Sequence, residues 1–239
     1  MAYAALAMSS AATRPPHPPQ TFAKAPETAP RPDQPDPRRY LQLAPAAPDG
    51  PIDLPQLWGD ATGLNMDMEL EIGFGRGMFL LERAEAAPGS RILGLEIKRK
   101  WAYLVGERAK KLGLQHVRVF GADARDVLLR LGPDASLARI FMHFPDPWWK
   151  KRHAKRRLNG AAMFDPVARL LRPGGELFIQ TDVEDRALGF LEDLREHGGF
   201  DLPESGFVAE NPYLARSNRE KRAIADGLPV YRILVHRRG

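Results

Sequence analysis

The chain has 239 residues, enough for one α/β domain with an additional segment, because domains cluster around ~100–200 residues. Apolar residues make up 44% of it, charged residues make up 27%, and no apolar run approaches the ~20 residues needed to span a bilayer, which excludes a helical membrane protein. The absence of cysteine excludes disulfides, thiolate metal sites and cysteine nucleophiles and permits a cytoplasmic location, while the formal charge of +5 favours a polyanionic partner.

Residues 1–55 form a segment rich in proline and alanine, which holds 13 of the 22 prolines. Its composition offers little apolar surface to offset the entropy of ordering, so we expect a disordered leader before a folded domain at residues 56–239. A transit peptide is an alternative, because the first 26 residues contain Arg14 and Lys24 but no acid. The prolines within residues 15–19 oppose the amphipathic helix that such peptides form.

After residue 63, apolar strand-like runs alternate with helical patterns. This alternation is typical of βαβ units and predicts an α/β fold with a mostly parallel sheet. The expected strands cover residues 69–72, 91–95, 117–120, 139–144, 176–181 and 230–235.

Three helices are expected between these strands. One ends at Gly113, a residue type that suits a left-handed cap, and another ends at the turn 172–175. The helix that ends at Gly113 is expected to turn one side toward the core, with Trp101, Leu104, Val105, Arg108 and Leu112 on that side. A helix beginning near Asp182 is expected to turn Leu188, Leu191 and Leu194 toward the sheet.

Residues 71–77 read Glu-Ile-Gly-Phe-Gly-Arg-Gly, where the first strand should turn into a helix. Gly73 and Gly75 allow positive φ and a close approach of the backbone to a ligand. A dinucleotide fingerprint would need its third glycine where Met78 stands, so pyrophosphate binding is disfavoured. The Glu71 carboxylate would repel a phosphate, but it suits a ligand that carries an ammonium and a sulfonium, as S-adenosylmethionine does.

Two further acids follow the next two strands. Glu96 ends the second strand, where Rossmann-type folds place an acid that binds the ribose hydroxyls. Asp123, followed by Ala124, comes after the third strand, where a carboxylate can accept a hydrogen bond from an adenine amino group. Glu96 can instead be a solvated strand end, and Asp123 can cap the next helix. Three acids at successive strand ends favour the cofactor interpretation; Glu69, on the same strand face as Glu71, has no assigned role.

The fourth strand leads into Phe-Pro-Asp-Pro-Trp-Trp at residues 144–149, followed by a basic run at 150–157. Prolines on both sides of Asp146 hold its carboxylate on a stiff loop at the carboxyl edge of the sheet. Trp148 and Trp149 can stack on a base or pack beneath the loop. The basic run can contact phosphates, although most charge runs are solvated surface.

Residues 144–157, with the glycine loop upstream and Gln-Thr-Asp at 180–182, resemble the bacterial tRNA (guanine-N7)-methyltransferase family. Its hallmark is a Phe-Pro-Asp-Pro-Trp element followed by a basic run, and the similarity extends from about residue 51 to the C-terminus. The resemblance implies a Rossmann-like class I methyltransferase with a seven-stranded sheet and helices on both faces. It also implies methyl transfer from S-adenosylmethionine to N7 of a guanine in tRNA, in the cytoplasm and without a metal. Monomer and homodimer both remain open.

The resemblance also carries residue roles onto matching positions. It implies that Glu71, Glu96, Asp123 and Asp146 hold the cofactor, with Asp146 also catalytic; Gly73, Gly75 and Ala124 complete the expected cofactor site. The substrate is assigned to Lys150, Asp182, Ser217, Asn218, Arg219 and Glu220. The RNA is assigned to Arg152, His153, Lys155, Arg156 and Arg157.

The segment 217–220 departs from the family, which usually has Thr-x-aromatic-Glu there. Arg219 stands at the aromatic position and puts the stacking contribution in doubt. Thr181-x-x-Glu184 and Ser217-x-x-Glu220 also match the capping box that begins many helices, so spacing alone does not separate capping from guanine contact.

Other functions remain open on the sequence. A class I methyltransferase for another RNA, a protein or a small molecule would keep the acids without needing the basic run. A nicotinamide-dependent reductase is disfavoured by the glycine spacing. A non-enzymatic RNA-binding protein on the same scaffold would not need the cofactor acids.

Overall fold

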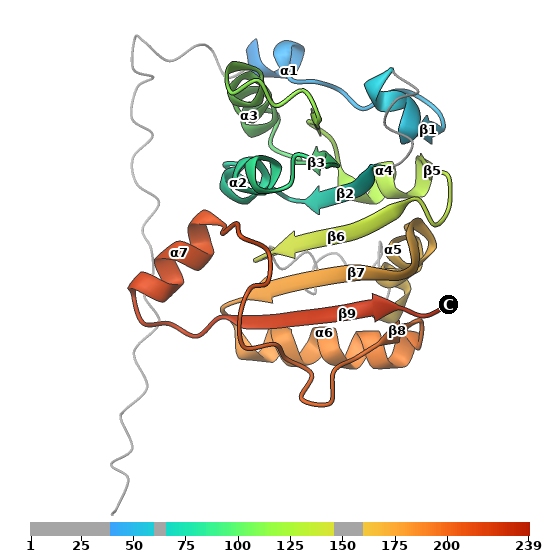
Figure 1. Ribbon diagram of the computed structural model, residues 1–239, viewed down its shortest axis with the longest axis vertical. Helices are drawn as coiled ribbons and strands as arrows, with labels where there is room; N and C mark the ends of the chain where they lie inside the picture. Colours follow the sequence, from blue (N-terminus) through green and yellow to red (C-terminus); the bar gives the residue numbers. More distant parts are fainter. Residues whose placement is uncertain (1–38, 60–65, 146–159) are drawn as a thin grey trace, which may run out of the picture. The chain divides into compact units, whose positions relative to one another are not determined.

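The structure is a computed structural model that describes residues 39–59, 66–145 and 160–239. All six expected strands are present (Figure 1). They are β2 (Asp67–Ile72), β3 (Ser90–Leu95), β4 (Val117–Phe120), β6 (Leu137–His143), β7 (Leu171–Thr181) and β9 (Tyr231–Arg237). The expected bounds hold to within two residues except at β7, which begins at Leu171.

The main sheet has seven strands in the order β4-β3-β2-β6-β7-β9-β8, of which β8 (Phe200–Asp201) was not predicted. The five strands from β4 to β7 in this order are parallel, while β9 runs antiparallel to β7 and β8. From β2 the chain proceeds outward through β3 and β4, and it then returns to β6 on the other side of β2. This reversal between β2 and β6 is the switch point at which open α/β sheets bind ligands, at the carboxyl ends of the strands.

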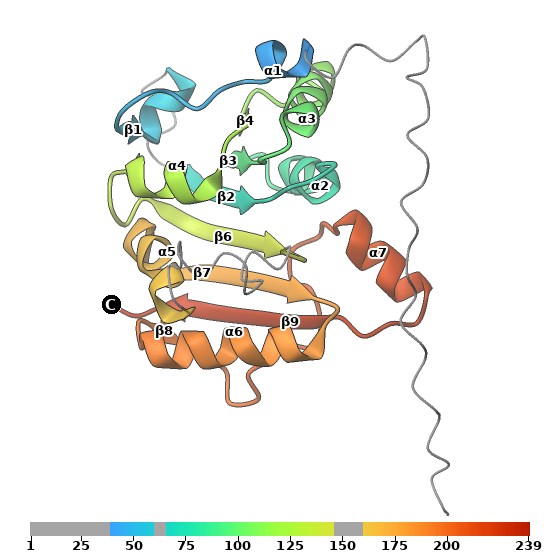
Figure 2. The same cartoon turned by 180° about the vertical axis from the view of Figure 1, so that it is seen from behind.

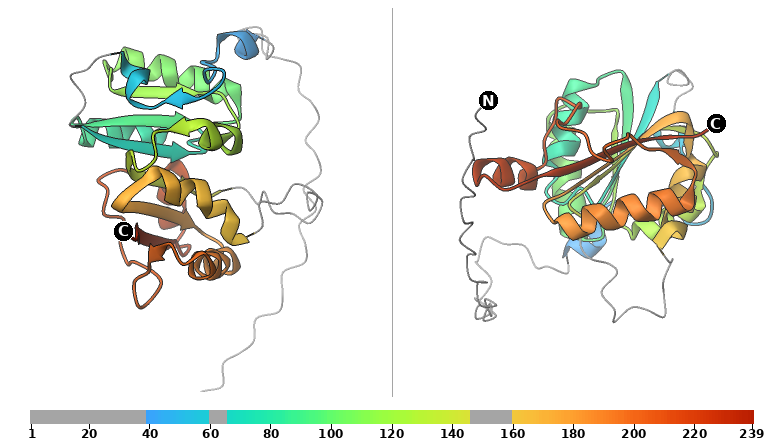
Figure 3. Two further views of the ribbon diagram at one scale, coloured as in Figure 1. Left: turned by 90° about the vertical axis from the view of Figure 1, so that its right-hand side faces the viewer. Right: turned by 90° about the horizontal axis from the view of Figure 1, so that it is seen from below.

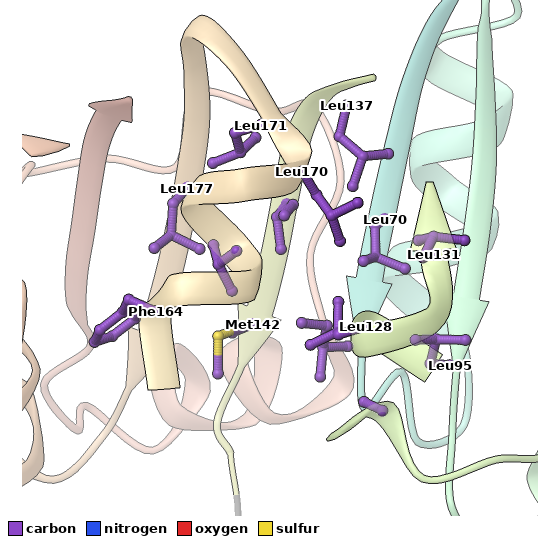
Figure 4. Close-up of a cluster of buried hydrophobic side chains, with 14 of the residues drawn as sticks. Leu70, Leu95, Leu128, Leu131, Leu137, Met142, Phe164, Leu170, Leu171 and Leu177 are labelled. Atoms are coloured by element: carbon purple, nitrogen blue, oxygen red, sulfur yellow. The ribbon is translucent and has the colours of Figure 1, made fainter. Parts of the chain in front are cut away.

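Helices cover both faces of the sheet, as the fold prediction requires. One face carries α4 (Ala124–Arg130), α5 (Asp165–Leu170) and α6 (Glu184–His197), and the other carries α2 (Met78–Ala86) and α3 (Arg99–Lys111). Figures 1 and 2 view the sheet from opposite sides. The main core lies between the sheet and the face that carries α4, α5 and α6, and Figure 4 shows Leu70 of β2, Leu128 of α4 and Leu170 of α5 within it. Because side chains alternate along a strand, Glu69 and Glu71 point to the other face.

Helix α3 ends as expected, with Gly113 at φ +70°, but its buried face differs from the prediction. The residues turned into the core are Ala102, Val105 and Ala109, whereas Arg108 is exposed and Leu112 is 49% exposed. A Cβ added at Gly106 would lie 3.2 Å from Val119, so α3 lies close to the sheet and small residues face it.

Helix α6 shows a similar difference. It buries Ala187, Phe190, Leu191 and Leu194, while Leu188 is 51% exposed, so the expectation for Leu188 was wrong. Part of the buried face of α6 consists of alanine and phenylalanine, so the spacing of leucines alone did not identify that face. None of the helices in the described ranges is long and apolar enough to cross a bilayer.

Residues 39–55 belong to the folded domain, although the sequence analysis placed them in the disordered leader. They contain α1 (Arg39–Leu43) and β1 (Ile52–Asp53), which pairs in parallel with β5 (Leu131–Gly132), and η1 (Pro55–Trp58) follows. Ile52 and Leu54 are buried in the main core, and Tyr40 packs against Tyr103. A few apolar anchors therefore order a proline-rich stretch; the rest of the expected leader, residues 1–38, lies outside the described residues.

Glu69 is a structural acid. Its carboxylate is fully buried and accepts hydrogen bonds from Arg83 at 2.6 and 2.8 Å, from Arg139 at 2.9 Å and from Ser90 at 3.2 Å. Arg139 also binds Asp67. Glu69, which had no role on the sequence, thus pairs with two arginines between the sheet and α2.

Candidate functional site

The glycine loop leaves β2 at the switch point and leads into α2. Gly73, Gly75 and Gly77 have φ of +74°, +55° and +72°, a region that favours glycine. A Cβ at Gly77 would lie 2.6 Å from Val105, so Gly77 lets the start of α2 approach α3. A Cβ at Gly73 or Gly75 would meet nothing within 4 Å. The glycines of the loop itself therefore face open space that a ligand can enter.

Glu96 fixes this loop from the end of β3. Its buried carboxylate accepts one hydrogen bond from the Gly75 N–H and one from the Lys98 N–H, both at 2.8 Å. The alternative of a solvated strand end is therefore wrong. Each carboxylate oxygen keeps a second lone pair, so the ribose contact stays a prediction.

Asp123 caps α4, which was the alternative to its predicted contact with adenine. Its carboxylate accepts hydrogen bonds from the Arg125 backbone N–H at 3.0 Å and from Arg125 Nε at 3.0 and 3.1 Å. The side-chain hydrogen bond from Arg125 lowers the pKa of Asp123. The Ala124 side chain is buried in the core. Adenine contact by Asp123 stays a prediction, and Ala124 can reach a ligand only through its backbone.

Glu71 and His143 form a buried pair on β2 and β6, the two strands that meet at the switch point. Glu71 Oε1 and His143 Nδ1 are 2.9 Å apart, and the side chains are 2% and 3% exposed. Glu71 Oε2 has no hydrogen-bond partner among the described residues. Buried polar atoms are nearly always paired, so this oxygen is a free acceptor at the predicted cofactor position. His143 was not predicted.

A cavity of about 210 Å³ opens beside this pair. It lies where the glycine loop, the ends of β2 and β6, and the start of α7 (Asn218–Ala225) meet, and Figure 3 shows α7 beyond the strand ends. Its lining comprises Glu71, Gly73, Phe74, Gly75, Arg76, Met78, Phe79, His143, Phe144, Ser217, Asn218 and Arg219. The structure thus brings the glycine loop and the segment 217–219 together, as the predicted roles require.

Asp182 and Arg219 form a two-pronged ion pair at the edge of this cavity. Arg219 Nε and Nη2 donate to the Asp182 carboxylate at 3.0 Å each, and the guanidinium lies 5.5 Å from the centre of the Phe144 ring. A neighbouring cavity of about 480 Å³ has Asp182, Arg219, Arg76 and Arg222 in its wall. The arginine at the family's aromatic position therefore has its guanidinium over an aromatic ring, a cation–π arrangement. The predicted substrate contacts of Asp182 and Arg219 stay predictions.

The segment 217–220 begins α7 with a side-chain cap. Ser217 accepts a hydrogen bond from the Glu220 N–H at 3.1 Å, which confirms the capping interpretation. Glu220 is fully buried, and its oxygens are held by Arg232 at 3.1 Å and Asn211 at 3.0 Å. Glu220 is thus held in the interior by two side chains, and its predicted base contact stays a prediction. Ser217 and Asn218 line the cavity and keep their predicted positions.

The proline-flanked segment continues from the cavity wall. Phe144 has φ of +49°, and its N–H donates to the Gln180 carbonyl at 2.7 Å. The described chain then stops at Pro145 and resumes at Gly160. The predicted residues Asp146, Trp148, Trp149, Lys150, Arg152, His153, Lys155, Arg156 and Arg157 lie outside the described residues.

The carboxylates beside the glycine loop suit a cationic group of a ligand. Glu71 and Glu96 flank the glycine loop, and an ammonium or sulfonium gains from nearby carboxylates that would repel a phosphate. Across residues 39–59, 66–145 and 160–239, no group of three or more His, Cys, Asp or Glu side chains is placed to hold a metal ion.

Comparison with known proteins gives consistent matches. The sequence model of a family described as "Putative methyltransferase" matches residues 66–233. The tRNA (guanine-N(7)-)-methyltransferase of Myxococcus xanthus is 41% identical over 180 residues, which cover 74% of this chain and 87% of that protein. Its counterpart in Anaeromyxobacter dehalogenans is 40% identical, with coverage of 74% and 87%. The crystal structure of a 30S ribosomal A1408 methyltransferase from an uncultured bacterium is similar in fold, with a TM-score of 0.52, 12% identity, and coverage of 82% and 98%.

Proposed function

The chain belongs to the tRNA (guanine-N(7)-)-methyltransferase family, and on that basis we propose that it methylates N7 of a guanine in tRNA. S-adenosylmethionine supplies the electrophilic methyl group when bound. The observation that carries the proposal is Glu71, which lines a cavity at the β2/β6 switch point and whose Oε2 has no partner among the described residues.

The residues of the chain contribute binding and orientation. Glu71 accepts hydrogen bonds from the cofactor ammonium, and Glu96 accepts them from the ribose hydroxyls while it holds the Gly75 N–H. Asp146 orients the reacting groups and offsets the positive charge that develops on the guanine. Guanine N7 has a free lone pair and no proton, so the chemistry depends on alignment rather than on a strong general base.

The acceptor is identified by the transferred label. Purified protein is incubated with methyl-labelled S-adenosylmethionine and unmodified tRNA, and the labelled position is mapped by chain cleavage with borohydride and aniline. We expect cleavage at one guanine or a few guanines, which N7 methylation sensitises. Label on another base atom would overturn the N7 assignment, and label on protein alone would overturn the RNA substrate. Since the substrate is tRNA, we propose a cytoplasmic location.

Neutralising the basic run is expected to weaken tRNA binding. Replacing Lys155, Arg156 and Arg157 by glutamine removes up to three phosphate contacts, so the apparent Kd should rise and its salt slope should fall by about one per lost contact. Filter binding at several salt concentrations measures both. The matched control replaces Lys110, Lys111 and Arg195 by glutamine. These basic residues are in the last turns of α3 and α6, at the end of each helix that lies away from the carboxyl ends of the strands. Equal weakening in both variants would contradict this binding surface.

A further inference from the structure

A row of polar side chains crosses the face of the sheet beneath the cavity. Glu71 is on β2, His143 on β6 and Gln180 on β7, three adjacent parallel strands. His143 is directly opposite Gln180, and Glu71 is opposite Phe141, two residues before His143 on the same face. All three side chains are buried. The row therefore extends from the predicted cofactor acid to β7, the strand that ends just before Asp182.

Most of this row lacks hydrogen bonds within the described chain. Glu71 Oε2, His143 Nε2 and both polar atoms of the Gln180 amide have no partner among the described residues. The surroundings are aromatic: the Phe79 ring centre is 4.0 Å from that of His143, and Phe141 and Phe178 lie at 6.1 and 6.0 Å. Such neighbours give no hydrogen bonds, so the free atoms need partners other than the described residues, and a ligand in the cavity can supply them for Glu71 and His143, which line it.

The contact between Glu71 and His143 shows which ring nitrogen carries a proton. A carboxylate oxygen only accepts, so His143 Nδ1 carries the proton that it donates to Glu71 Oε1. In the neutral ring, Nε2 then has a lone pair and is an acceptor. The pair thus offers two acceptors, Glu71 Oε2 and His143 Nε2, and both residues line the cavity.

We propose that His143 is a positioning residue for the cofactor: it orients Glu71 through Nδ1 and, with Nε2, accepts a second hydrogen bond from the same cofactor ammonium. An ammonium has three N–H donors, which match two acceptors on neighbouring strands. The identity of the ligand rests on the proposed function. The role of His143 rests on the geometry of the pair, because a purely structural His-Glu contact would not leave an unpaired atom on each side chain.

Variants of His143 test this role by cofactor affinity. His143→Leu removes both nitrogens, whereas His143→Asn keeps an N–H donor near the position of Nδ1. We expect calorimetric Kd values for S-adenosylmethionine to rise at least tenfold in His143→Leu and about threefold in His143→Asn. The matched control is Phe141→Leu, on the same face of β6, which should lower the melting temperature and leave Kd within twofold. Unchanged affinity in His143→Leu, or equal losses in all three variants, would overturn the proposal.

A measurement on the wild-type protein avoids any folding defect of the variants. In protein labelled with ¹⁵N in its imidazoles, the resonances of His143 should show a proton on Nδ1, and the Nε2 signal should shift when S-adenosylhomocysteine, which keeps the ammonium, saturates the site. A proton on Nε2, or a signal that does not move, would overturn the proposal. Failure of the wild-type protein to bind the cofactor would instead refute the proposed function, so the two failures are distinguishable.

Discussion

Replacing Asp146 by alanine is expected to lower the rate of methyl transfer by at least about 10³-fold while tRNA binding persists, since removing one preorganised electrostatic contact in an active site costs about 10²–10³ and Asp146 also holds the cofactor. The residues just before Asp146 are well anchored. Phe144 lines the cavity, its N–H is bonded to Gln180, and the Pro145 carbonyl accepts a hydrogen bond from Arg186 at 3.4 Å. The two described residues before Asp146 are therefore held by hydrogen bonds to Gln180 of β7 and to Arg186 of α6.

Single-turnover methyl transfer with saturating tRNA and cofactor measures the chemical step, and filter binding measures tRNA affinity. Asp146→Asn separates charge from shape, because the amide keeps the size of the carboxylate but cannot offset a positive charge. We expect Asp146→Asn to be nearly as slow as Asp146→Ala. An alanine variant that retains a tenth of the wild-type rate would contradict the catalytic role.

Glu69 and Glu71 give a matched pair with opposite expected effects. Glu69→Gln removes the buried carboxylate that Arg83 shares with Arg139; Arg139 keeps Asp67 and Glu176, but Arg83 loses its counter-charge, so the free energy of unfolding should fall by roughly 3–5 kcal/mol. Glu71→Gln keeps an oxygen that can accept from His143 but loses the charge that the ammonium meets. Its cofactor Kd should rise about 10–100-fold, since a hydrogen bond to a charged group contributes ~1.5–3 kcal/mol.

Urea unfolding and calorimetric titration of both variants separate the two roles. Glu71→Gln should unfold within about 1 kcal/mol of the wild-type protein, because its hydrogen bond to His143 can persist. Glu69→Gln, measured where it is folded, should bind the cofactor with nearly wild-type affinity. Exchanged effects would show that the structural and ligand-binding acids have been assigned the wrong way round.

The sequence pointed to Glu71 as the cofactor acid from its place before the glycine loop, but it could not assign a role to Glu69. Both are glutamates on one strand and one face, and their roles depend on partners far away in the chain. Arg83 and Arg139 lie 14 and 70 residues from Glu69, and His143 lies 72 residues from Glu71. Local spacing could predict the strand and its carboxyl-edge acids, because both depend on the alternation of residues. It could not predict which acid would be paired.

The same limit explains the other differences. Glu220 fits a substrate-contacting motif by spacing, but Arg232 and Asn211 bring it into the interior. His143 ends an apolar strand and has no local motif; its alternation with Phe141 on the face of Glu71 was the available signal. In residues 39–55, Ile52 and Leu54 are buried against a core formed by residues far along the chain, so the composition alone indicated a leader.

The most direct test of the account is a calorimetric titration of the wild-type chain with S-adenosylmethionine. The carboxylates around the glycine loop predict saturable binding of one molecule per chain, displaced by S-adenosylhomocysteine and unaffected by nicotinamide dinucleotides. A chain that is folded by circular dichroism and shows no binding of S-adenosylmethionine would contradict both the cofactor site and the proposed reaction.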